Sequence, residues 1–94
     1  MLKHIVLFKL KDKSDAAATK EILLSMKGRV PEVLDIEVGT DVLHSERSYE
    51  IALTVTLADL AALDRYQDDT YHCDVVKKHM HAVREASVAC DYFV

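Results

Sequence analysis

The chain has 94 residues, of which 50% are hydrophobic and 30% charged, and its formal net charge is −4. This composition is typical of one folded domain rather than a disordered chain, and a domain of this size gains stability from association. No run of basic residues is longer than Lys77-Lys78, which argues against nucleic-acid binding because that depends on neutralising phosphates. No apolar run approaches the roughly 20 residues that cross a bilayer.

The two cysteines, Cys73 and Cys90, have neither the spacing of metal ligands nor the density of a disulfide framework. Free thiols in a compact domain are typical of a reducing compartment, and the opening residues show no secretory signal pattern. We therefore expect a cytoplasmic protein without a metal or cofactor.

The first predicted element is a strand over residues 2–10. Alternate residues of a strand share a face, so His4 lies on the same face as Val6 and Phe8, among core side chains. His4 is there either as a hydrogen-bonded packing residue or as the polar group of a pocket.

A helix is predicted next, from the capping residues Ser14 and Asp15 to Gly28, which suits the position just beyond a helix C-terminus. Pro31 prevents the helix from continuing. The stripe that this helix buries consists of Thr19, Ile22, Leu23 and Met26.

Two further strands are predicted, over residues 33–38 and 49–57, because apolar and polar residues alternate in both. Gly39 ends or bulges the first of them, and a polar loop over residues 40–48 joins the two. The remaining predicted elements are helices over residues 58–67 and 71–85 and a closing strand over residues 87–94.

This order, β-α-β-β-α-α-β, predicts an α+β fold over residues 1–94: a ferredoxin-like antiparallel sheet with helices on one face. No helix is left to cover the other face. The residues assigned to that face are Ile5, Leu7, Ala52, Thr54, Ala89 and Phe93, with the charged residues Lys3, Asp35, Glu50 and Asp91 among them. Stacking against a second copy would bury its apolar part, so we expect a homodimer.

Several segments form a joint pattern that extends along nearly the whole chain. They are residues 3–11 (Lys-His-Ile-Val-Leu-Phe-Lys-Leu-Lys), 30–33 with 36–39, 48–51, 66–72 (Tyr-Gln-Asp-Asp-Thr-Tyr-His) and 91–92. Together they resemble the stress-responsive α/β-barrel (Dabb) domain family. The resemblance implies a ferredoxin-like monomer that pairs sheet to sheet into a dimeric α/β barrel. One departure is Asp69-Thr70, where the family usually has His-Pro.

The resemblance also implies site residues. The catalytic histidine of the family's plant polyketide cyclase matches His72, a neighbouring tyrosine matches Tyr66, and a pocket histidine of the first strand matches His4. Two other polar pocket residues of that enzyme fall at Ile51 and near Leu23, which are apolar here. The cyclase activity is therefore not carried over.

The residues themselves also predict a small, mainly apolar cavity between sheet and helices. On an ideal wheel of the last helix the sheet-facing side consists of His72, Val76, His79, Met80 and Val83. His81 points away from this side. The expected lining comprises His4, Val6, Phe8, Ile51, Leu53, Tyr66, His72 and His79.

Three functions remain open. The first is a homodimer that binds a small, largely apolar molecule. The second is an enzyme of the polyketide-cyclase or cofactor-free monooxygenase type, with His72 as general base and with Tyr66 and His4 polarising an oxygen. The third is a structural stress protein without a ligand. The acidic residues Asp68 and Asp69 near His72 are read as helix caps rather than metal ligands. No nucleic-acid or membrane partner is expected.

Overall fold

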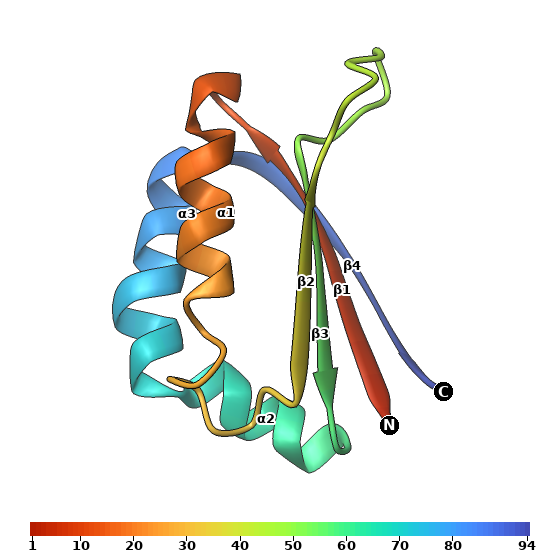
Figure 1. The fold of residues 1–94 in the computed structure, drawn as a ribbon, viewed down its shortest axis with the longest axis vertical. Helices are drawn as coiled ribbons and strands as arrows, with labels where there is room; N and C mark the ends of the chain where they lie inside the picture. Colours follow the sequence, from red (N-terminus) through yellow and green to blue (C-terminus); the bar gives the residue numbers. More distant parts are fainter.

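An antiparallel sheet in the order β2-β3-β1-β4 carries the helices on one of its faces (Figure 1). The structure is a computed structural model that describes residues 1–94. The strands are β1 (Leu2–Leu10), β2 (Asp35–Thr40), β3 (Ile51–Leu57) and β4 (Arg84–Phe93). The helical segments are η1 (Lys13–Asp15), α1 (Ala16–Leu24), α2 (Leu60–Asp68), η2 (His72–Lys77) and α3 (Lys78–Val83). The predicted ferredoxin-like fold is confirmed.

Strand β1 lies inside the sheet and pairs antiparallel with both β3 and β4. Its even-numbered residues face the helices and are all buried, as the alternation in the sequence predicts. His4 lies on this face, directly opposite Val55 on one side and Asp91 on the other. The core beneath the helices is built from this row, the inward row of β3 and the buried side of α1. None of the helices is both long and apolar enough to cross a membrane.

Helix α1 is shorter than predicted. It ends at Leu24, and the chain continues to Gly28 in tight turns, with amide-to-carbonyl bonds from Met26 to Leu23 and from Lys27 to Leu24. The hydroxyl of Ser25 donates to the carbonyl of Ile22 and so competes with the helical pattern. Gly28 has a φ of 85°, the left-handed conformation that glycine adopts most readily at the end of a helix.

The assignment of β4 residues to the two faces of the sheet was wrong. Directly opposed residues of an antiparallel pair share a face, and the register pairs Val6 with Ala89 and Leu2 with Phe93. Ala89, Asp91 and Phe93 therefore lie on the helix-facing side. The residues of β4 on the uncovered side are Ala86, Val88, Cys90 and Tyr92, opposite Lys9, Leu7, Ile5 and Lys3 of β1.

The limits of two strands also differ from the prediction. Gly39 does not end β2 but pairs with Ala52 within it, and the strand runs on to Thr40. Strand β4 begins at Arg84, directly after α3, because β1 extends far enough to pair with it there.

Glu50, which was assigned to the uncovered face, is instead buried, with 7% of its surface exposed. Its carboxylate accepts a hydrogen bond from the backbone amide of Leu10, with 2.6 Å between nitrogen and oxygen. The register between β1 and β4 shifts between Lys9 and Leu10, so the sheet is irregular at this point. Glu50 thus satisfies an amide at the irregular end of β1.

Replacing Glu50 by alanine should lower the free energy of unfolding by about 2 kcal/mol, because a buried amide loses a charge-assisted partner. Urea denaturation checks this, with Glu46→Ala as the matched control, since Glu46 is exposed in the loop between β2 and β3. Equal stability of the two variants would contradict a structural role for the buried carboxylate.

Candidate functional site

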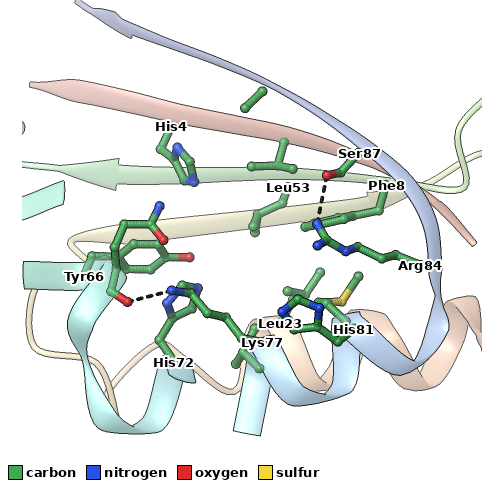
Figure 2. A pocket seen from close by; sticks show the side chains of 15 residues that line it. His4, Phe8, Leu23, Leu53, Tyr66, His72, Lys77, His81, Arg84 and Ser87 are labelled. Atoms are coloured by element: carbon green, nitrogen blue, oxygen red, sulfur yellow. Dashed lines mark hydrogen bonds between the residues drawn. The ribbon is translucent and has the colours of Figure 1, made fainter. Parts of the chain in front are cut away.

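A pocket of about 360 Å³ lies between the helix-facing side of the sheet and the segment formed by η2 and α3 (Figure 2). Its lining consists of His4, Val6, Phe8, Leu23, Leu53, Tyr66, Gln67, His72, Val76, Lys77, Met80, His81, Arg84, Ser87 and Ala89. Most of the residues expected from the sequence are therefore brought together. Ile51 and His79 are not among them.

Ile51 and His79 have other surroundings. Ile51 pairs with Phe8 at the beginning of β3 and is buried in the core with 1% of its surface exposed. His79 is hydrogen-bonded through Nε2 to the hydroxyl of Thr19 on α1, at 2.9 Å. It thus links two helices.

A π-helical turn explains why His81 lines the pocket in place of His79. Residues His72–Lys77 form a π-helix, in which the hydrogen bonds run from i to i+5 and each turn holds more residues than in an α-helix. Every following side chain is therefore turned around the axis relative to an ideal wheel. Lys77 and His81 come to line the pocket by this rotation, which sequence periodicity alone does not reveal.

His4 is oriented by the carboxylate of Asp91, which was predicted on the uncovered face but lies on the helix-facing side. Its Nδ1 is hydrogen-bonded to Oδ1 of Asp91, the residue directly opposite on β4. Because an ionised carboxylate only accepts hydrogen bonds, Nδ1 of His4 is the donor in this pair. The ladder between β1 and β4 sets this pairing, and it extends to the chain ends, where the amide of Val94 donates to the carbonyl of Met1.

Tyr66 lies between the two histidines. Its ring centroid is 5.7 Å from that of His4, in an edge-on arrangement, and 4.3 Å from that of His72. Its hydroxyl donates to the sulfur of Met26 at 3.6 Å. Burial raises the pKa of the Tyr66 hydroxyl above its ordinary value, so the group stays protonated at neutral pH.

His72 is buried at the start of η2, and its Nδ1 has no hydrogen-bond partner. Burial, reinforced by the positive charge of Lys77, lowers the pKa of His72 to about 4. The ring is therefore neutral at pH 7. A base with so low a pKa accepts protons poorly at neutral pH, so His72 is better suited to a hydrogen bond with a neutral polar atom.

The acidic residues near His72 serve the backbone. Oδ1 of Asp69 accepts a hydrogen bond from the amide of His72 at 3.1 Å, as expected of a helix cap. No group of three histidine, cysteine or acidic side chains is arranged to hold a metal ion.

The model of the Dabb family, the stress responsive A/B barrel domain, matches residues 2–94. The chain belongs to the Dabb family. The resemblance carried by the sequence segments is thereby confirmed. No curated protein matches this Dabb domain.

Solved structures agree with this assignment. A dimeric protein of unknown function with a ferredoxin-like fold from Bacteroides fragilis is 27% identical, with a TM-score of 0.87 and coverage of 99% of this chain and 95% of that one. A Dabb family protein from Mesorhizobium loti is 25% identical, with a TM-score of 0.75 and coverage of 99% and 95%. A dimeric ferredoxin-like protein from Thermobifida fusca, at 20% identity, TM-score 0.83 and coverage of 99% and 90%, shares the fold.

The two histidines of this Dabb domain thus offer different chemistry. His4 is held in a fixed orientation by the hydrogen bond from its Nδ1 to Asp91. His72 presents a neutral ring with an unpaired nitrogen. Tyr66 between them is a protonated hydroxyl whose ring forms an apolar wall. Together they can bind and orient a polar group of an otherwise apolar molecule.

The lowered pKa of His72 should make the Dabb domain sensitive to acid. Between the ordinary pKa of 6.5 and about 4 the unfolded state binds a proton that folded His72 does not, so stability falls as the pH falls through this window. Between about pH 7.5 and about pH 4.5 the wild type should lose about 2 kcal/mol more than a His72→Gln variant, whose amide does not titrate. Urea denaturation at both pH values and NMR titration of the His72 ring test this. A His72 pKa close to 6.5 would refute it.

Proposed function

We propose that this Dabb domain binds a small, largely apolar molecule in the pocket and that His72 and His4 hold its polar group. The observation that carries the proposal is His72, whose ring lines the pocket and whose Nδ1 is buried without a hydrogen-bond partner. Buried polar atoms are nearly always hydrogen-bonded, and leaving one unpaired costs about 1–3 kcal/mol. A ligand hydroxyl or carbonyl that bonds to the His72 ring would offset this cost.

The volume of the pocket also indicates the size of the ligand. Its volume of about 360 Å³ lies at the small end of the usual range for ligand sites, about 300–1,000 Å³. Its walls between the polar groups are aliphatic or aromatic, with Leu23, Leu53 and Met80 among them. These properties suit a single ring or a short chain. They also favour a binding role over a structural protein whose own side chains fill the cavity.

A substitution that fills the pocket should weaken binding. Ala89 lines the pocket from β4 and is exposed, so Ala89→Phe adds a ring there without disturbing the core. We expect 4-butylphenol to raise the unfolding temperature of the wild type and to show saturation-transfer NMR signals, while Ala89→Phe binds it at least about tenfold more weakly. Ligand at 100 times its dissociation constant stabilises a fold by about 2.7 kcal/mol.

The matched control is Ala61→Phe, since Ala61 is exposed on α2 and does not line the pocket. This variant should bind the phenol as the wild type does. Equal binding by Ala61→Phe and Ala89→Phe, or no binding by the wild type, would count against the proposal.

We further propose that two copies associate through the uncovered face of the sheet. Leu7, Val88 and Tyr92 lie on this face and have 38%, 51% and 44% of their surface exposed. A patch of this kind is typical of an interaction surface. The related protein from Bacteroides fragilis is described as dimeric, which supports the same arrangement here.

A charge in the centre of this face should separate the copies. Val88→Asp should sediment as a monomer in analytical ultracentrifugation at a concentration where the wild type is a dimer, because a dimer would bury the new carboxylate. Val75→Asp is the control, since Val75 is 39% exposed on η2 in the helical layer. A dimer of Val88→Asp, or a monomeric wild type, would rule out this interface.

A further inference from the structure

The lining of the pocket is positively charged although the protein is acidic. The chain has 16 acidic and 12 basic residues, not counting histidine. The pocket wall nevertheless contains Lys77, Arg84 and His81 and neither aspartate nor glutamate. The local charge is thus opposite in sign to that of the whole protein.

The fixed charges of the pocket have no acidic partner. Nζ of Lys77 donates to the carbonyl of Gln67 at 2.9 Å, and Nη1 of Arg84 donates to the hydroxyl of Ser87 at 3.1 Å. Neither side chain forms a salt bridge, whereas Lys9, Lys27 and Arg65 each pair with a carboxylate elsewhere. A guanidinium has five N–H donors in a planar fork, so Arg84 retains free donors that match a carboxylate.

Arg84 and the polar ring cluster lie at opposite ends of the pocket. Figure 2 shows His81, Arg84 and Ser87 at one end and His4, Tyr66 and His72 at the other. Ser87 is opposite Phe8 and Asp91 is opposite His4, so four strand residues, or about 13 Å, separate the two positions along β4. The carboxylate of Asp91 is bonded to His4 at the end away from Arg84, and that of Asp69 accepts from the amide of His72 at the same end.

We infer that the ligand is an amphipathic carboxylic acid whose carboxylate pairs with Arg84, while a second polar group at the far end of its apolar body reaches His4 and His72. This inference rests on the proposed function and specifies the chemical class of the ligand. One negative charge suits the site, because Lys77 is already hydrogen-bonded to Gln67 and the apolar walls disfavour a more highly charged group. Arg84 supplies the bidentate contact that a carboxylate prefers.

The test compares two probes of nearly the same shape, 5-(4-hydroxyphenyl)pentanoic acid and its primary amide, by isothermal titration calorimetry. The wild type should bind the acid at least about tenfold more tightly than the amide, and added NaCl should weaken only the acid. Arg84→Gln should weaken the acid about tenfold and leave the amide unchanged. Arg47→Gln, a matched change at an exposed loop residue, should alter neither affinity.

The outcomes separate this inference from the proposed function. If the amide binds as tightly as the acid, or if Arg84→Gln leaves the preference intact, the inference fails while binding in the pocket stands. If neither probe binds, both fail. Circular dichroism shows whether Arg84→Gln is folded, and if it is not, the comparison of acid and amide at low and high salt in the wild type decides the question.

Discussion

The position of β1 inside the sheet is the constraint on which the rest of this structure depends. Because β1 pairs antiparallel with β3 on one side and β4 on the other, its alternation fixes which residues of all three strands face the helices. The same pairing places Asp91, from the last strand of the chain, opposite His4. The Asp91 carboxylate then orients the His4 ring. A slip of one residue between β1 and β4 would remove that carboxylate and turn the apolar row of the outer face inward.

Burial then widens the pH range over which the polar groups stay uncharged. It lowers the pKa of His72 and raises the pKa of Tyr66, because the pocket wall solvates the charged form of each poorly. The carboxylate of Glu50 is also buried, and the hydrogen bond it accepts from the amide of Leu10 offsets the cost of burying it. Of these three groups, His72 alone retains a buried nitrogen without a partner, and its ring lines the pocket.

Much of this arrangement follows from sequence pattern, but two parts of it do not. The alternation of residues 2–10 and the stripe of α1 locate His4 and Leu23 on the pocket side because regular periodicity determines them. The face of β4 was misassigned because Ser87–Val94 carries apolar residues in both rows, so that only its register with β1 decides. The exchange of His79 for His81 depends on one π-helical turn, which no hydrophobic pattern marks.

That turn also absorbs one extra residue within the helical layer. A π-helical turn holds more residues than an α-helical turn, so loss of one residue from η2 would restore ordinary helical hydrogen bonds and still leave His81 facing the cavity. Conversion of η2 to an α-helix at constant chain length would instead rotate His81 away from the cavity. The π-helical turn thus lets the chain length of this layer change without disturbing the sheet order or the wall of the cavity.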